Sequence, residues 1–239
     1  MSADAVDPAT EVAIPAATVV LLRNGSRGVE TLMLRRDANL EFAGGMWVFP
    51  GGRVDPGDYT SGVDPARADD VAALDAARRA AVRETDEEAG LTIEAAMLVW
   101  FAHWTPSVGA TRRFATWFFA ARAPEGAVVI DDGEIRAHEW VAPGDVIGRH
   151  RAGEVSLLPP TWMTLTELAR GASVDDLLVR LGARPPVHYV TKVARTSDGV
   201  TVAMWGGDAG YDDNDPDVRG RRHRLWMRDG DWELELTGT

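Results

Sequence analysis

Three glutamates stand close together in the stretch RETDEEAGL, residues 83–91. On a helix, Glu84, Glu87 and Glu88 would lie within about one and a half turns of one another. Like charges at this spacing repel by about 0.2–0.5 kcal/mol, so the group is costly unless it holds something positive. Carboxylate oxygens are the ligands that Mg²⁺ prefers, and Mn²⁺ accepts the same donors. The alternative is a solvated acidic face without a ligand.

A helix is expected to carry these glutamates, from about Asp70 to Ala89. Asp69 and Asp70 suit its N-terminus, and Gly90 suits its C-terminal cap. At 100° per residue one stripe of this helix should face the core; its members are Val71, Leu74, Val82, Thr85 and Ala89. Arg78 falls within the stripe, so its stem is expected to run along apolar surface to reach water.

The segment MWVFPGG, residues 46–52, predicts a short strand that ends in two glycines. Without Cβ atoms, Gly51 and Gly52 would allow the loop backbone to approach the glutamate helix closely. FPGG followed by Arg-Glu-U-x-Glu-Glu-x-Gly-U, where U is aliphatic, resembles the Nudix hydrolase family. Three features depart from the family pattern: Thr85 at the first U position, Asp75 in place of an earlier glutamate, and an insert at residues 53–68. Asp75 could instead pair with Arg79 four residues later.

The similarity extends over residues 15–170 to the Nudix subgroup that includes peroxisomal coenzyme A diphosphatases of animals. The segments that carry it are LMLRRDANLEFAGGMWVFPGGRVDPGD, WTPSVGATRRFATWFFAA and LLPPTWMTLTELA. The subgroup has His-x-Gly-Gln ahead of FPGG, where this chain has FAGGMWV.

The resemblance implies Mg²⁺- or Mn²⁺-dependent hydrolysis of a diphosphate in a nucleoside-diphosphate derivative. It implies that Glu84, Glu87 and Glu88 bind the metal and that Glu84, Glu87 and Arg83 are catalytic, Arg83 by orienting the glutamates. The residues expected at the substrate are Arg35, Arg36, Arg113, Gly51 and Gly52. The general base stays open between Glu84 and a later loop carboxylate, the candidates being Asp131, Asp132, Glu134 and Glu139.

Coenzyme A or acyl-CoA, cleaved to 3′,5′-ADP and (acyl-)phosphopantetheine, is the substrate expected first. The alternatives are ADP-ribose or a dinucleotide, or a Nudix-fold binding module without catalysis. Trp104 and Trp117 could stack on a nucleobase, although core packing is favoured for both.

The remaining pattern predicts an α/β fold, a Nudix-type α/β/α sandwich with a mixed sheet and a C-terminal β-rich extension. Strands are expected at 17–24, 29–36, 91–104, 112–123 and 134–143, and helices at 159–172 and 173–183. Beyond the Pro pair at 185–186 only strands are expected, including a hairpin that turns on Asp229-Gly230. The expected domains are a flexible tail at 1–14, a Nudix hydrolase domain at 15–183 and the extension at 184–239.

The net charge of −12 argues against a nucleic-acid or membrane-surface binder, which would need a basic surface. A small anionic substrate stays compatible with it, because a few placed arginines can reverse the local field. The chain has no cysteine for a disulfide or a thiolate metal site. No apolar run approaches a membrane span, and the acidic N-terminus is unlike a signal peptide, so a cytoplasmic protein is expected, with a homodimer as one option.

Overall fold

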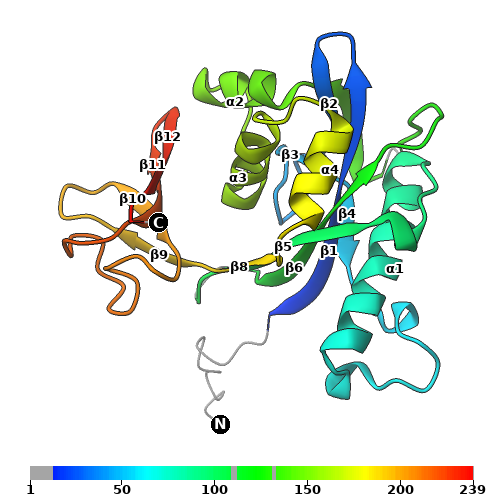
Figure 1. The fold of residues 1–239 in the computed structure, drawn as a ribbon, viewed down its shortest axis with the longest axis horizontal. Coiled ribbons are helices and arrows are strands. Elements are labelled where there is room, and N and C mark those ends of the chain that lie inside the picture. The colour runs from blue at the N-terminus through cyan, green and yellow to red at the C-terminus, as the bar shows by residue number, and fades with distance from the viewer. Residues whose placement is uncertain (1–12, 109–111, 131–132, 239) are drawn as a thin grey trace. The chain divides into compact units, whose positions relative to one another are not determined.

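A computed structural model describes residues 13–108, 112–130 and 133–238 (Figure 1). The chain divides into two compact units. As far as they are described, the larger unit comprises residues 15–103, 116–130 and 133–187, and the smaller unit comprises residues 13–14, 104–108, 112–115 and 188–238.

The sheet of the larger unit has the strand order β3-β2-β1-β6-β5, with β4 beside β1 and β7 beside β2. Its strands are β1 (Ile14–Gly25), β2 (Gly28–Arg36), β3 (Trp47–Val48), β4 (Gly51–Arg53), β5 (Val99–Thr105), β6 (Phe114–Arg122) and β7 (Ile135–Val141). β1 and β2 form an antiparallel hairpin in which Gly25 pairs with Gly28, as their glycine-bounded turn predicts.

The segment MWVFPGG forms two very short strands, β3 and β4, where one strand was expected. Pro50 lies between them and has no N–H to donate to a continuous ladder. β4 pairs antiparallel with β1, Gly52 opposite Ala17, and this pairing fixes the glycine pair beside the sheet.

Helix α1 (Asp70–Ala89) forms at the expected residues. The Asp69 side chain accepts from the Ala72 N–H at its start, and Gly90 ends it in the left-handed conformation with φ 63°. The expected core stripe is partly wrong, because Val71 is 69% exposed. The fully buried residues of α1 are Ala76, Ala77, Ala80, Ala81, Thr85 and Ala89. Small side chains let the helix lie close to the sheet, where they pack against residues of β1 and β2.

Arg78 was expected to extend to water, and instead its guanidinium finds partners within the protein. Its guanidinium lies 5.3 Å from the Phe119 ring centroid and donates to the carbonyls of Ala95 and Leu98. Those carbonyls belong to residues expected in a strand from residue 91. That strand begins only at Val99, because a 3₁₀ turn, η4 (Ala95–Met97), precedes it.

Helices α3 (Pro159–Leu168) and α4 (Val174–Gly182) form as expected, each slightly shorter. Helix α2 (Pro143–Arg151) was not predicted, since its two glycines and few apolar residues give no clear helical stripe. Figure 1 shows α1 on one side of the sheet and α2, α3 and α4 on the other, which accounts for the burial of both faces of β1. The insert carries two 3₁₀ turns, η2 (Pro56–Asp58) and η3 (Pro65–Arg67).

In the smaller unit an antiparallel sheet runs in the order β12-β11-β10-β9. Its strands are β9 (Lys192–Arg195), β10 (Thr201–Met204), β11 (His223–Arg228) and β12 (Asp231–Leu236). β8 (Val187–Val190) precedes them in the chain and is not a strand of this sheet. β11 and β12 turn on Asp229-Gly230, as expected. Trp104 stacks on Tyr189 at 3.9 Å between ring centroids and meets Trp205 edge-on at 5.7 Å.

The α/β class and the additional C-terminal sheet expected from the sequence are thus confirmed. Of the helices in the described ranges, none combines the length and apolar character that crossing a membrane requires.

Candidate active site

The C-terminal part of α1 lies against the Gly51-Gly52 backbone, and two of the three glutamates touch it. The Gly51 N–H donates to Glu88 Oε2 at 2.9 Å. A Cβ placed on Gly52 would lie 2.4 Å from Glu84 Cδ, and one on Gly51 would lie 2.3 Å from the Ala17 carbonyl oxygen. The Gly51 position therefore requires glycine, whereas a Cβ on Gly52 would displace the Glu84 carboxylate. The structure brings both glycines together with Glu84 and Glu88.

Glu88 is 7% exposed, which is rare for a carboxylate. Burial, with a smaller contribution from the nearby Glu84 and Glu134 charges, raises its pKa to about 8 against the opposing effects of the Gly51 N–H and Arg36. Burial also raises the pKa of the Glu84 carboxyl, although Arg83 opposes it. Glu87, by contrast, is exposed. A buried acid beside a half-buried one, both with raised pKa values, is a common feature of functional sites.

Arg83 uses its guanidinium to bind the glutamates on one side and the insert on the other. Its Nη1 donates to Glu84 Oε1 at 2.8 Å and to Glu87 Oε2 at 3.0 Å. Its Nε and Nη2 donate to the two carboxylate oxygens of Asp58 at 3.2 and 2.9 Å, and Nη2 also reaches the Arg53 carbonyl at 3.0 Å. Hydrogen bonding to Asp58, more than any other contact, raises the pKa of Arg83 further. Each nitrogen of the Arg83 guanidinium therefore binds a group of the protein itself.

Of the two adjacent arginines on β2, only Arg36 faces the glutamates. Its Nη1 lies 3.8 Å from Glu88 Oε1, and its Nη2 lies 2.8 Å from Glu134 Oε2. Arg35 is exposed. Successive side chains of a strand point to opposite faces, so the α1 side of the sheet receives Leu34 and Arg36 rather than Arg35.

Of the two later candidate bases that the structure describes, Glu134 lies beside this group, through its ion pair with Arg36. Glu139 lies on β7 and pairs with Arg149 of α2 at 2.7 Å, on the other side of the sheet. Asp131 and Asp132 lie outside the described residues.

The expected convergence of three carboxylates on one point is not found. Within the described ranges, no three His, Asp or Glu side chains form a group placed to hold a metal ion. The hydrogen bonds explain this arrangement: Glu84 and Glu87 are turned to Arg83, and Glu88 is turned to the Gly51 N–H.

A divalent cation nevertheless fits the chemistry of these donors. Glu84 and Glu88 are hard oxygen ligands partly or wholly removed from water, and a cation would offset the cost of burying their charge. The absence of a Cβ at Gly52 leaves the Glu84 carboxylate room at the loop.

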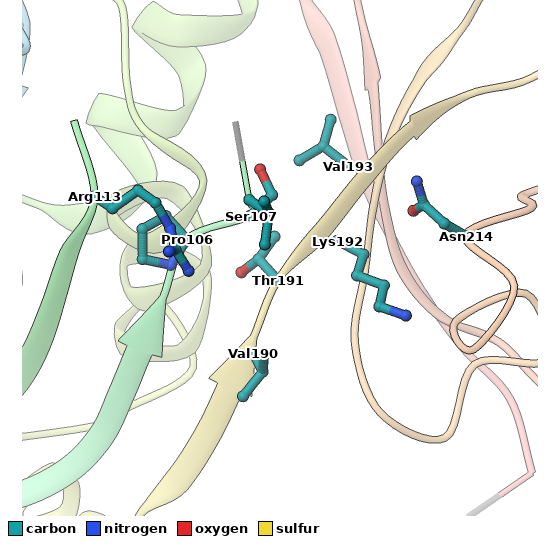
Figure 2. Close-up of a pocket in the computed structure, with 9 residues that line it drawn as sticks. Pro106, Ser107, Arg113, Val190, Thr191, Lys192, Val193 and Asn214 are labelled. Atoms are coloured by element: carbon teal, nitrogen blue, oxygen red, sulfur yellow. The ribbon is translucent and has the colours of Figure 1, made fainter. Parts of the chain in front are cut away.

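Arg113, expected at the substrate, belongs to the smaller unit. There it lines a pocket of about 240 Å³ together with Lys192 and Asn214 (Figure 2). Most of the other lining residues are apolar, among them Pro106, Val108, Val190 and Val193. Trp104 is 4% exposed, and Trp117 packs against the core of the larger unit.

Asp58 is the residue of this group that sequence reasoning missed. It lies in the insert, where no family motif marks it, and it is 6% exposed. The available signal was the run Asp55-Pro56-Gly57-Asp58, which is typical of a tight turn closed by two acids.

Comparison with known families gives a match of residues 13–159 to the NUDIX domain. This match covers more than half of the chain, which therefore belongs to the NUDIX domain family, as the resemblance of its glutamate motif predicts. Members of this family generally use divalent metal ions.

Two individual proteins illustrate the similarity. The chain is 28% identical to the human acyl-coenzyme A diphosphatase NUDT19 over 121 residues, which are 48% of this chain and 32% of that protein. The chain thus spans only about a third of that relative's length. A NUDIX hydrolase structure from Alicyclobacillus acidocaldarius aligns with a TM-score of 0.63 at 22% identity, over 74% of this chain and 100% of that one. The similarity to the Alicyclobacillus acidocaldarius structure confirms the Nudix-type fold.

Proposed function

We propose that this protein hydrolyses the diphosphate linkage of a nucleoside-diphosphate derivative with Mg²⁺ or Mn²⁺ bound at Glu84, Glu87 and Glu88. The observation that carries the proposal is the pair of acids Glu84 and Glu88, held beside Gly51-Gly52 with raised pKa values. A solvated acidic face without a ligand would gain no stability from removing these carboxylates from water.

In the proposed reaction water attacks one phosphorus, the bond to the bridging oxygen breaks, and the second phosphate leaves with that oxygen. A bound divalent cation would supply charge neutralisation on the diphosphate and a lower pKa for its water. Glu84 or Glu134 would take the proton of the attacking water. Arg83 would hold Glu84 and Glu87 in place.

Arg35 and Arg36 are proposed to bind phosphate, because a guanidinium can grip two phosphate oxygens at once. Gly51 and Gly52 would bring backbone close to the same groups. Arg36 already neutralises Glu88 and Glu134, so phosphate binding there would compete with these two carboxylates.

Coenzyme A or an acyl-CoA is the proposed substrate, cleaved to 3′,5′-ADP and (acyl-)phosphopantetheine. The support is the resemblance of the segments around the glutamate motif, together with the similarity to a protein named acyl-coenzyme A diphosphatase. ADP-ribose and dinucleotides are the competing substrates.

The decisive test offers coenzyme A, an acyl-CoA, dephospho-coenzyme A, ADP-ribose and a dinucleotide to the full chain, with products identified by mass spectrometry. Activity should require Mg²⁺ or Mn²⁺, vanish with EDTA and return with excess metal. In ¹⁸O-labelled water the label should enter one product only, and that product identifies the attacked phosphorus. Full activity in EDTA would refute the metal proposal, and preference for ADP-ribose would refute the coenzyme A assignment.

The same assay should include Glu88→Gln with Glu94→Gln, an exposed acid outside the site, as the matched control. The amide can still accept from the Gly51 N–H, so the fold should persist without metal. Its gain in stability should be complete above about pH 8, where the buried Glu88 carboxyl of the unaltered chain becomes charged. Catalysis should fall by about 10²–10³, because the variant lacks a charge that acts in the transition state. Binding without hydrolysis in the unaltered chain would instead indicate a non-catalytic module.

A further inference from the structure

We propose that Asp58 is a positioning residue for cation binding, holding Arg83 so that Glu84 and Glu87 each keep one oxygen available for the metal. This inference rests on the proposed function. It assigns a role in the site to the insert at residues 53–68, which the sequence marked only as a departure from the family pattern.

Asp58 is fixed before it meets Arg83. It ends the 3₁₀ turn η2, its N–H donates to the Asp55 carbonyl at 2.9 Å, and its Oδ2 accepts from the Asp55 N–H at 2.8 Å. The turn begins with Pro56, whose ring restricts φ. With 6% exposure, the carboxylate has little freedom to choose another partner.

A second arginine of α1 holds the same turn. Arg79, one helical turn before Arg83, donates to the Asp58 carbonyl and to Thr60 Oγ1, the latter at 3.2 Å. Arg79 thus reaches the insert, where pairing with Asp75 had been the alternative. Because two successive turns of the helix grip one turn of the insert, the position of Asp58 relative to α1 is well defined.

The charge balance explains what Asp58 does for the glutamates. It accepts from Nε and Nη2 of Arg83, so Nη1 alone serves Glu84 and Glu87. Each glutamate gives one oxygen to this nitrogen, and for the other oxygen no hydrogen bond is found within the described part of the chain. Without the opposing carboxylate, the whole guanidinium could turn to Glu84 and Glu87 and compete with a cation for both.

The test measures Mn²⁺ binding to the full chain by electron paramagnetic resonance, without substrate, in Asp58→Asn. The dissociation constant should rise about tenfold or more, the loss usual when a residue orienting a metal ligand is changed. In steady-state assays at saturating Mn²⁺, kcat should fall while KM for the substrate changes less than about twofold, since Asp58 touches no proposed substrate-binding residue.

The matched control is Asp64→Asn. Asp64 lies in the same insert, and its carboxylate caps η3 by accepting from the Ala66 N–H at 3.0 Å. This variant removes one charge of the insert without touching Arg83, and the asparagine oxygen can still accept from the Ala66 N–H, so Mn²⁺ affinity should not change. Asp58→Glu keeps the charge on a longer stem, should recover part of the affinity, and provides the test should Asp58→Asn not fold.

The outcomes separate this inference from the proposed function. If the unaltered chain binds no Mn²⁺, the proposed function fails and the inference with it. If the unaltered chain binds Mn²⁺ and both Asp58 variants bind it equally well, only the inference is overturned. An equal loss in Asp64→Asn would also overturn it, because general loosening of the insert would then suffice.

Discussion

The two adjacent glycines of the loop have different neighbours. A side chain at Gly51 should therefore disturb the fold, and a side chain at Gly52 should disturb the proposed metal site. A Cβ on Gly51 would meet backbone: the Ala17 carbonyl oxygen at 2.3 Å and Thr18 Cα at 2.7 Å. A Cβ on Gly52 would meet only the end of the Glu84 side chain, within 2.5 Å. Backbone in a sheet cannot move away cheaply, whereas a glutamate carboxylate can rotate.

Gly51→Ala should therefore destabilise the fold, by about 1–3 kcal/mol as for other overpacked sites. Gly52→Ala should leave unfolding in urea nearly unchanged but displace the Glu84 carboxylate and weaken Mn²⁺ binding. Urea titration and Mn²⁺ titration of the two variants, side by side, test the contrast. Equal losses of stability in both would show that the loop is not held as described.

The placement of Glu84 and Glu88 beside Gly51 and Gly52 could be predicted from the sequence, because the family resemblance rests on a local motif and a helix converts residue spacing into position. Side-chain partners that depend on the tertiary structure could not be predicted in this way. Which of Arg35 and Arg36 faces the helix depends on the register of β2, and the partner of Arg83 depends on how the insert folds back. The rotation of Glu84 and Glu87 toward Arg83 is likewise a tertiary effect that no motif encodes.

At the level of elements, predictions that rest on strong local signals are confirmed: the β1–β2 turn, the caps of α1 and the Asp229-Gly230 hairpin are all present. Errors arose where packing overrides pattern. The large apolar residues of α1 predict a buried face that includes Val71. In the structure alanines form the buried face, because they allow close contact with the sheet, and Val71 is exposed to solvent. Helix α2 lacks a clear apolar stripe, so the sequence pattern does not predict it.

The smaller unit contains a buried ion pair that ties an irregular segment to strand β11. Asp208 accepts from Nε and Nη2 of Arg224 at 2.8 and 2.6 Å, and Arg224 Nη1 reaches the Pro216 carbonyl at 2.6 Å. The side chains of both partners are fully buried. Burial alone would raise the pKa of Asp208, but hydrogen bonds from Arg224, His223 and Gly210 outweigh it and lower the pKa to about 2.

The pKa of Asp208 is lower in the folded state than in the unfolded chain, where it is about 3.9. The ion pair with Arg224 therefore stabilises the smaller unit fully above that pH, and this stabilisation is lost as the pH falls toward 2. The urea midpoint should drop over this window in the unaltered chain. Asp208→Asn should cost about 3–5 kcal/mol at pH 7, because it leaves the Arg224 charge buried without its counterion, and should flatten the acid dependence. Asp213→Asn, in the same segment but exposed, is the control and should retain the dependence.

Taken as a whole, the chain does not separate into units at one point along its sequence. Strands β5 and β6 belong to the larger unit for most of their length, yet residues 104–115, at their connected ends, belong to the smaller unit. Trp104 is central there: it is 4% exposed, and its neighbours Tyr189 and Trp205 both come from the C-terminal segment. A contact between sequence-distant rings of this kind leaves no trace in local patterning.

A chain shortened to end at Arg184 should therefore fail to remain a well-packed monomer. It would lose both rings that cover Trp104, and burial of one aromatic side chain contributes about 4–6 kcal/mol, taking 150–250 Å² at 25 cal/mol/Å². We expect red-shifted tryptophan emission, binding of the dye ANS and concentration-dependent aggregation. Adding Trp104→Thr to the shortened chain should reduce both dye binding and aggregation, because the exposed ring is their source. If the shortened chain instead stays monomeric with an unchanged unfolding midpoint, the C-terminal segment is a separable addition and Trp104 does not depend on it.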